Sequence, residues 1–311
     1  MAVLSIKKKK IIFILGPTAI GKSEVAVYLA RKINAEVISC DSMQVYKGMD
    51  IITSKPGRVL TKSVKHHLIG VAPLKKEYDV FLFRNAALKK IKEIFKIGKI
   101  PLIVGGTGLY ASVLSNGIFE CKEQDNSLRN KFYRIAKNRG SRYLHDQLRK
   151  SDPVAAAKIH PNDTRRIVRA LEVFKITGSP ISLLQKEKRG LKDEYDVRVF
   201  CLNMPREKLY KKIDSRVERM FNKGLINEVR GLLKKRLSRT ASFAIGIKEI
   251  SSYLRGDSTK KEAKDMVKLN TRRYAKRQLT WFRKDKGTVW VNISEKDKSF
   301  KIAGRIWKKL C

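Results

Sequence analysis

An eight-residue segment that begins at Gly16 has the pattern G-x-x-x-x-G-K-[ST] of loops that bind phosphate groups. In such loops the glycines let successive backbone N–H groups point at phosphate oxygens, and the following helix adds its positive N-terminal end. Lys22 supplies a positive charge, and the hydroxyl of Ser23 is a ligand for Mg²⁺. We therefore predict a phosphate site, called the phosphate loop, that is formed by Gly16, Pro17, Thr18, Ala19, Ile20, Gly21, Lys22 and Ser23.

The elements around this loop are those that its function requires. Residues 11–15 form a β-branched and aromatic run typical of a buried strand, and residues 24–32 place apolar side chains on one helical face. Further strands are predicted at 35–40, 101–104, 197–204 and 289–291, and helices at 81–95, 208–237 and 260–283. This alternation predicts an α/β fold with a parallel sheet core like that of P-loop NTPases, followed by a helical C-terminal region.

Two polar residues follow predicted strands and are therefore expected near the phosphate loop, because open α/β sheets bind ligands at the carboxyl ends of their strands. Asp41 follows the second strand and has three possible roles: a Mg²⁺ ligand, a general base, or a cap on the next turn. Thr107 lies in a glycine-rich segment and is either a hydroxyl for the phosphates or a helix N-cap. Residues 47–73 are predicted to form polar loops that cover the site, and the pair His66-His67 is expected to have a surface or hydrogen-bonding role rather than to bind a metal together.

The strand pattern disappears between residues 118 and 195, where the sequence becomes basic and helical. We predict that 118–195 is a helical insertion domain, and that 1–117 and 196–311 together form the α/β core. Residues 122–192 contain 18 basic and 7 acidic side chains, a local net charge of +11. Arg165, Arg166 and Arg169 have helical spacing that would let them meet a phosphate backbone together, although a solvated helix face has the same pattern.

The whole chain is strongly basic, with 70 Lys and Arg against 29 Asp and Glu and a net charge of +41. A polyanion such as RNA is the first explanation, and a general coding bias towards lysine is the alternative. No segment has the length or apolar character of a membrane span, and no signal peptide is recognised. Its four cysteines include no C-x-x-C pair. We expect a cytoplasmic monomer without a membrane partner.

Several motifs, read in order, resemble those of the bacterial-type tRNA dimethylallyltransferases, also called tRNA isopentenyltransferases. Besides the phosphate loop, they comprise 41–51, 53–56, 66–68, 105–110, 152–153, 159–163, 165–166, 169–173, 275–278 and 281–283. The chain departs from the family pattern at three positions: Ile52, where glycine is usual, Gly70, where aspartate is usual, and Ile247, where tyrosine is usual.

The resemblance implies that a dimethylallyl group is transferred from dimethylallyl diphosphate to the exocyclic N6 amine of the adenosine immediately 3′ of the anticodon. It implies that the phosphate loop binds the diphosphate with Mg²⁺, that Asp41 is the general base, and that Thr107 and Arg216 assist catalysis. The insertion would grip the tRNA anticodon stem-loop. The tRNA contacts implied by the resemblance are Asp41, Ser42, Met43, Gln44, Thr107, Arg129, Arg165, Arg166 and Arg169.

Three other functions share part of this pattern. A small-molecule or nucleotide kinase has the same loop and sheet but does not need the basic insertion. A non-catalytic RNA-binding protein does not need an intact phosphate loop with Asp41 and Thr107. An adenylate isopentenyltransferase, which acts on free nucleotides, has the same core, and the arginines at 165, 166 and 169 favour RNA over it.

Overall fold

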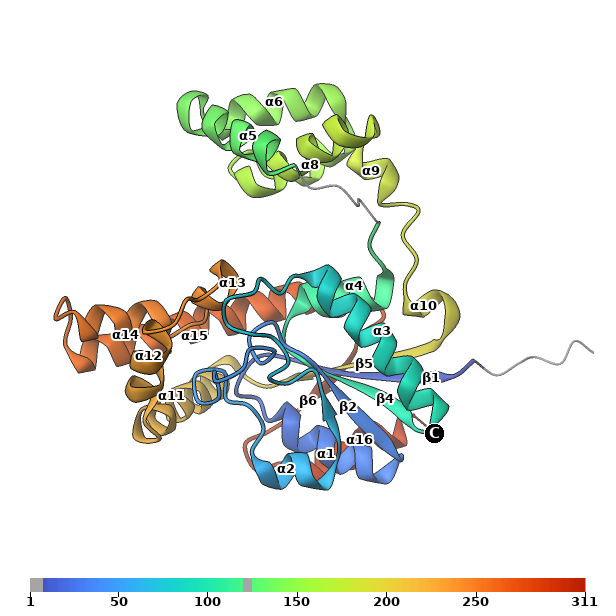
Figure 1. The fold of residues 1–311 in the computed structure, drawn as a ribbon. Helices are drawn as coiled ribbons and strands as arrows, with labels where there is room; N and C mark the ends of the chain where they lie inside the picture. The colour runs from blue at the N-terminus through green and yellow to red at the C-terminus, as the bar shows by residue number, and fades with distance from the viewer. Residues whose placement is uncertain (1–7, 120–124, 311) are drawn as a thin grey trace, which may run out of the picture. The chain divides into compact units, whose positions relative to one another are not determined.

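The computed structural model describes residues 8–119 and 125–310, which form two compact units (Figure 1). The core unit comprises the described residues of Met1–Ser115 and Glu194–Cys311, and the insertion unit those of Asn116–Asp193. Cys40 and Cys201 are buried free thiols, whereas Cys121 and Cys311 lie outside the described residues. Among the described helices, none is both long and apolar enough to cross a membrane.

The core unit is built on a six-stranded sheet in the order β3-β2-β4-β1-β5-β6, in which every pair of neighbours is parallel. The strands are β1 (Lys10–Leu15), β2 (Ala35–Cys40), β3 (His66–His67), β4 (Ile100–Gly105), β5 (Asp196–Asn203) and β6 (Val289–Asn292). The predicted α/β fold with a parallel sheet is confirmed. Because the strands are parallel, β1, β2 and β4 all end on the same side of the sheet, at Leu15, Cys40 and Gly105. Ligands of such folds bind at this carboxyl-terminal side.

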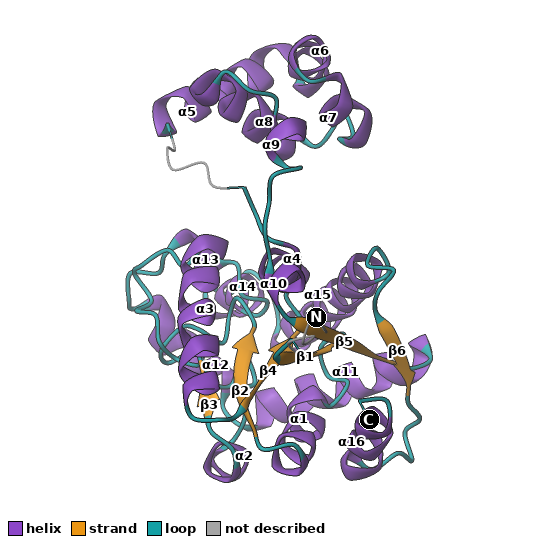
Figure 2. Cartoon of the chain, turned by 90° about the vertical axis from the view of Figure 1, so that its right-hand side faces the viewer, coloured by secondary structure: helices purple, strands orange, loops and turns teal. Residues whose placement is uncertain are grey.

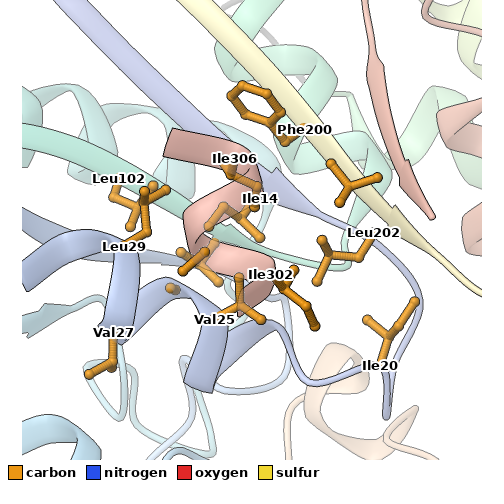
Figure 3. Packing of buried hydrophobic residues seen from close by; sticks show 14 of the residues in the cluster. Ile14, Ile20, Val25, Val27, Leu29, Leu102, Phe200, Leu202, Ile302 and Ile306 are labelled. Carbon is orange, nitrogen blue, oxygen red and sulfur yellow. The ribbon is translucent and has the colours of Figure 1, made fainter. Parts of the chain in front are cut away.

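Helices cover both faces of this sheet (Figure 2). On one side lie α1 (Lys22–Lys32), α2 (Arg58–Ser63) and α16 (Ser299–Lys308); on the other lie α3 (Val80–Lys96) and α4 (Gly108–Asn116). Figure 3 shows Ile14 of β1 packed among Val25 and Leu29 of α1 and Ile302 and Ile306 of α16. Burying each such side chain contributes about 1.5–3 kcal/mol. This packing fixes the start of α1, and therefore the phosphate loop, against the end of β1.

The predicted helical C-terminal region packs on the segment that follows β2. It consists of α11 (Arg206–Asn222), α12 (Leu225–Leu233), α13 (Arg239–Ser242), α14 (Ile247–Leu254) and α15 (Lys260–Phe282). Val45, Tyr46 and Met49 are fully buried in one apolar cluster with side chains of these helices. The single helical stretch predicted at 208–237 is two helices, because the chain turns at Gly224 with φ of 91°. These helices therefore hold the residues after Asp41 in place.

The segment predicted as loops between residues 47 and 73 contains the short helix α2 and the two-residue strand β3, so that prediction was incomplete. Strand β3 adds to the sheet edge beside β2, where His67 Nε2 lies 2.7 Å from a carboxylate oxygen of buried Glu36. Lys99 donates to the same carboxylate at 2.9 Å. Burial raises the pKa of Glu36, but these two hydrogen bonds and the charge of Lys99 more than offset it and hold the pKa below its ordinary value.

The insertion unit is entirely helical in its described part. Its helices are α5 (Asn126–Arg139), α6 (Ser141–Ser151), α7 (Pro153–Lys158), α8 (Thr164–Thr177), α9 (Ile181–Leu184) and α10 (Leu191–Glu194), the last ending at the unit boundary. Asp125, Asp152 and Asp163 cap helices α5, α7 and α8 by accepting backbone N–H groups. Leu144, Ile167 and other apolar side chains form a separate core within this unit.

Candidate active site

The phosphate loop connects β1 to α1 through a curled backbone. Ala19 and Gly21 both have positive φ, 65° and 97°, which curls the loop so that its N–H groups can converge. Gly21 precedes α1 without a side-chain cap, so no side chain of this residue competes for the N–H groups of the first turn. Ala19 pays about 1–3 kcal/mol for its unusual backbone, a strain typical of ligand-binding loops. Lys22 Nζ donates to the carbonyl of Pro17 at 2.8 Å, inside the curl.

Gln278 of α15 links this loop to the segment after β4 by two hydrogen bonds. Its Oε1 accepts the N–H of Thr18 at 2.9 Å, and its Nε2 donates to the carbonyl of Gly106 at 2.8 Å. The side chain is 4% exposed. A Cβ at Gly106 would lie 2.2 Å from Gln278 Nε2, so a larger residue there would displace the Gln278 side chain. The sequence showed Gln278 only as part of a motif and did not indicate this role.

Asp41 follows β2 and lies at the edge of the sheet beside the phosphate loop. Its Oδ1 accepts the backbone N–H groups of Met43 at 2.9 Å and Gln44 at 3.2 Å, so the carboxylate does cap the next turn. Oδ2 takes no part in these two bonds and remains for other chemistry. Thr107 Oγ1 accepts the N–H of Ser42 at 3.0 Å, which ties the segment after β4 to the segment that carries Asp41.

Arg216 extends from α11 to the same place. Its Nη1 donates to Thr18 Oγ1 at 2.8 Å, and its Nη2 lies 3.5 Å from the carbonyl of Thr53. Burial lowers the pKa of Lys22 to about 8; the charge of Asp41 opposes this and that of Arg216 adds to it. Burial likewise lowers the pKa of Arg216, again opposed by Asp41. The structure therefore brings Lys22, Asp41 and Arg216 into one electrostatic cluster.

Two cavities meet at this cluster. The larger, about 780 Å³, is lined by Thr18, Ala19, Gly21, Lys22 and Ser23 of the phosphate loop and by basic side chains of α11, whereas Ile20 of the loop is buried in the hydrophobic core. The smaller, about 230 Å³, is more apolar and is lined by Met43, Tyr274 and Phe243 among others. The residues that line both cavities are Thr18, Asp41, Thr53, Arg216 and Met220. Asp41 is thus the carboxylate at the junction of the polar cavity and the apolar cavity.

The remaining predicted contacts near Asp41 divide between the two cavities. Ser42 and Met43 line the apolar cavity, whereas Gln44 lines the polar one. Gln44 Oε1 accepts the hydroxyl of Ser39 at 3.1 Å, and its Nε2 lies 3.4 Å from the carbonyl of Thr53. Thr107 is absent from the residues that line either cavity and is linked to the apolar cavity by its hydrogen bond with Ser42.

Glu228 of α12 holds the loop that forms a wall of both cavities. Its carboxylate accepts the backbone N–H groups of three consecutive residues, Asp50, Ile51 and Ile52, at distances between 2.8 and 3.1 Å. No motif in the sequence indicated this clamp, because the two partners are more than 170 residues apart. Ile52 itself, which departs from the family pattern, is buried and lines the apolar cavity.

The other two departures have structural roles as well. Gly70 has φ of 61° and its N–H donates to the carbonyl of Gln44 at 2.8 Å, so it supports the segment after Asp41. Ile247 is buried in the apolar cluster of the C-terminal helices.

Glu172, a buried carboxylate of the insertion unit, changes the interpretation of the predicted arginines there. Arg129 donates to both oxygens of Glu172 at 2.9–3.2 Å, and Arg169 Nη1 donates to Oε2 at 3.0 Å. Arg129 and Arg169 therefore neutralise a charge within the protein. Arg165 and Arg166 are exposed on α8. Of the three arginines expected on one surface, Arg165 and Arg166 are exposed, whereas Arg169 is partly buried and forms an internal ion pair.

Comparisons with known proteins agree with this architecture. A family model described as IPP transferase matches residues 44–285, and one described as isopentenyl transferase matches residues 9–67. The chain is 48% identical over 300 residues to the tRNA dimethylallyltransferase of Carboxydothermus hydrogenoformans, with 96% of each chain covered. The chain belongs to the tRNA dimethylallyltransferase family. The predicted family is confirmed, and with it a prenyltransferase activity class.

Solved structures of this family have the same fold. The chain is 40% identical to the full-length tRNA isopentenylpyrophosphate transferase of Bacillus halodurans, with a TM-score of 0.70 and coverage of 98% of this chain and 97% of the other. It is 31% identical to a eukaryotic dimethylallyltransferase acting on tRNA, with a TM-score of 0.82 and coverage of 96% and 77%. The likeness to these transferases extends over both units of the chain.

Proposed function

We propose that this protein transfers a dimethylallyl group from dimethylallyl diphosphate to the exocyclic N6 amine of the adenosine immediately 3′ of the tRNA anticodon. The observation that carries the proposal is the position of Asp41 at the junction of a phosphate-binding cavity and an apolar cavity. A group-transfer enzyme with two unlike substrates needs such a meeting point. The membership of the tRNA dimethylallyltransferase family supports the choice of substrates.

The polar cavity suits the diphosphate. Backbone N–H groups at the start of α1, the ammonium of Lys22 and the guanidinium of Arg216 line one cavity and complement its negative charge. Mg²⁺ prefers oxygen ligands and usually combines one or two protein ligands with phosphate oxygens and water. Ser23 lines this cavity, and its hydroxyl fits that donor set together with phosphate oxygens and water; the described residues contain no cluster of three or more His, Cys, Asp or Glu that could hold a metal alone. Bound there, Mg²⁺ would neutralise charge on the departing diphosphate.

The apolar cavity suits the two organic groups that must meet. In the reaction the lone pair of the adenine amine forms a bond to the allylic carbon, the carbon–oxygen bond of the diphosphate ester breaks, and its electron pair leaves with diphosphate. The amine is a weak nucleophile because its lone pair is delocalised into the ring. Asp41 would accept the amine proton on Oδ2 while Oδ1 stays fixed by the N–H groups of Met43 and Gln44.

The charge that develops on the diphosphate is stabilised by groups already in position. Arg216 is held by Thr18 of the phosphate loop, so its guanidinium need not reorganise during the reaction. We propose that Thr107 acts one step away, by fixing the N–H of Ser42 and so the turn that orients Asp41. In this assignment Lys22, Arg216 and Asp41 contact the reacting groups and Thr107 positions one of them.

The RNA must present its adenosine as an unstacked base, because the amine of a base stacked in the anticodon loop cannot reach a carboxylate in a cavity. Ser42 and Met43 line the cavity that would receive the base, and Gln44 lies next to them. We propose that the insertion unit binds the anticodon stem-loop, with Arg165 and Arg166 as phosphate contacts on the exposed part of α8. Arg129 and Arg169 would act mainly by holding Glu172.

We propose a monomer as the active form. A cytoplasmic location follows from the proposed tRNA substrate.

The experiment that tests this function pairs two acceptors with two donors. The protein is incubated with Mg²⁺ and either an unmodified anticodon stem-loop RNA or AMP, together with either dimethylallyl diphosphate or ATP. We expect a product only from the RNA with dimethylallyl diphosphate, located by mass spectrometry at the adenosine 3′ of the anticodon. Prenylated AMP as the main product would indicate a free-nucleotide enzyme, and ADP from AMP and ATP a kinase. RNA binding without any product would indicate a non-catalytic RNA-binding protein.

A further inference from the structure

The side chain of Phe243 is 64% exposed, more than any other aromatic side chain that the structure describes. Phe243 directly follows the short helix α13, and the residues around it are firmly anchored. Ala241 and Ala244 are buried, and Ser238 Oγ accepts the N–H of Ala241 at 3.2 Å. The N–H of Ser238 in turn donates to the carbonyl of Leu74 at 2.7 Å. A fixed backbone thus presents a large apolar ring to solvent, at the expense of the free energy that its burial would contribute.

The ring lies at the apolar cavity that adjoins Asp41. The cavity is lined by Phe243, Tyr274 and Arg277, none of which lines the polar cavity. These three residues therefore lie in the part of the apolar cavity that is not shared with the polar one. Two guanidinium groups accompany the aromatic rings: that of Arg239 lies 5.9 Å from the centre of the Phe243 ring, and that of Arg277 lies 5.8 Å from the centre of the Tyr274 ring. Aromatic faces with adjacent cations are the composition of surfaces that bind single-stranded nucleic acids.

We propose that Phe243 stacks on a nucleobase that flanks the reacting adenosine, in the RNA bound as proposed above. When one base leaves a stacked loop, its two neighbours each lose a stacking partner. An exposed ring at the mouth of the receiving cavity replaces that partner, while Arg239 and Arg277 face the phosphates between the bases. This inference rests on the proposed function, and it adds a contact to a base beside the reacting one.

The test compares Phe243→Ala, which removes the ring, with Phe243→Trp, which keeps an aromatic face, and Phe243→Leu, which keeps apolar volume only. Phe300→Ala is the matched control, because Phe300 is 50% exposed on α16 and its ring contacts that of Tyr28 edge-on. The affinity of each protein for the anticodon stem-loop RNA is measured together with the KM for dimethylallyl diphosphate. Thermal unfolding checks that each variant is folded.

We expect Phe243→Ala and Phe243→Leu to weaken RNA binding by roughly 5- to 100-fold, the range for loss of one stacked base. Phe243→Trp and Phe300→Ala should bind RNA as the unchanged protein does, and in Phe243→Ala and Phe243→Leu the KM for dimethylallyl diphosphate should change less than the RNA affinity. Equal RNA affinity of the Ala variant and the unchanged protein, or a Leu variant that equals the Trp variant, would overturn the proposal.

A second measurement identifies the stacked base. The base on the 5′ or 3′ side of the reacting adenosine is removed from the RNA, which leaves an abasic nucleotide, and each RNA is tested with the unchanged protein and with Phe243→Ala. For one of the two positions, the loss of binding free energy caused by the abasic nucleotide and the loss caused by Phe243→Ala should not be additive. Full additivity at both positions overturns the stacking contact. If the unchanged protein transfers no dimethylallyl group to RNA, the proposed function fails instead.

Discussion

Replacement of Gln278 by leucine removes the two hydrogen bonds that support the phosphate loop, at nearly constant side-chain volume. The carbonyl of Gly106 then loses its buried hydrogen bond, which costs about 1–3 kcal/mol. The N–H of Thr18 borders a cavity and can bond to water instead, so its loss costs nearer the net value of a hydrogen bond, about 1 kcal/mol. We therefore expect Gln278→Leu to lower the free energy of unfolding by about 2–4 kcal/mol.

The same change should affect one substrate and not the other. Thr18 also holds Arg216 through its hydroxyl, so movement of Thr18 disturbs both the loop amides and the guanidinium that face the diphosphate. A loss of 1.4 kcal/mol of binding is a tenfold weaker affinity, and we expect the KM for dimethylallyl diphosphate to rise about 10- to 100-fold. RNA affinity should stay unchanged.

The assay combines denaturant unfolding with initial rates at saturating RNA. Thr280→Ala is the matched control, because this hydroxyl is exposed on the same helix and donates only within it, to the carbonyl of Lys276. A Gln278→Leu protein with unaltered stability and an unaltered KM for the diphosphate would refute the supporting role of Gln278.

Three further changes test other parts of the site. Because the pKa of Lys22 lies at about 8, its ammonium is lost above that pH in the free protein, and kcat/KM for the diphosphate should fall as pH rises through about 8; a pH–rate profile without that descending limb contradicts the assignment. Glu172→Gln should lower the stability of the insertion unit by about 1–3 kcal/mol in thermal unfolding, because Arg129 and Arg169 lose their charged hydrogen-bond partner but are partly exposed to water; unaltered stability would contradict a stabilising role of Glu172. Arg165→Ala combined with Arg166→Ala should weaken RNA binding and lower the salt slope by roughly 0.7–0.9 per lost phosphate contact in isotherms at several salt concentrations.

The control for the arginine pair is Lys308→Ala combined with Lys309→Ala, which removes two exposed charges from the end of α16. Equal losses of RNA affinity in the two double variants would mean that the basic charge acts as a diffuse field. Arg169 is left unchanged in this test, because its removal would also leave Glu172 with one partner fewer.

The sequence predicted most of the sheet because its central strands β1, β2 and β4 are buried nearly throughout and are therefore mostly apolar runs. The predicted strand 35–40 coincides with β2, and the others differ from the observed strands by one residue or two in total. Strand β3 was missed because two residues carry no periodicity, and its place is set by pairing with Val37 and Ile38 across the sheet edge. Local pattern therefore identified the elements but not the short pairings that depend on tertiary contact.

The phosphate loop was predictable for a similar reason, since all its chemistry lies within eight consecutive residues. The supports of the site were not predictable, because each depends on a partner distant in sequence. Gln278 acts on Thr18 from 260 residues away, and Glu228 acts on Ile52 from 176 residues away. Arg169 has the helical spacing of a phosphate contact, but its guanidinium donates to Glu172, a buried carboxylate three residues later on the same helix.

The claim that a single carboxylate at the junction of the two cavities performs the transfer is tested most directly by Asp41→Asn. The amide oxygen of asparagine can still accept the N–H groups of Met43 and Gln44, so the turn stays formed, but the side chain can no longer take a proton from the amine. The measurement is the single-turnover rate of dimethylallyl transfer with saturating anticodon stem-loop RNA and diphosphate. We expect the rate to fall by about 10²–10⁴ while RNA affinity and the KM for dimethylallyl diphosphate change little. A rate close to that of the unchanged protein would contradict the assignment of Asp41 as the base.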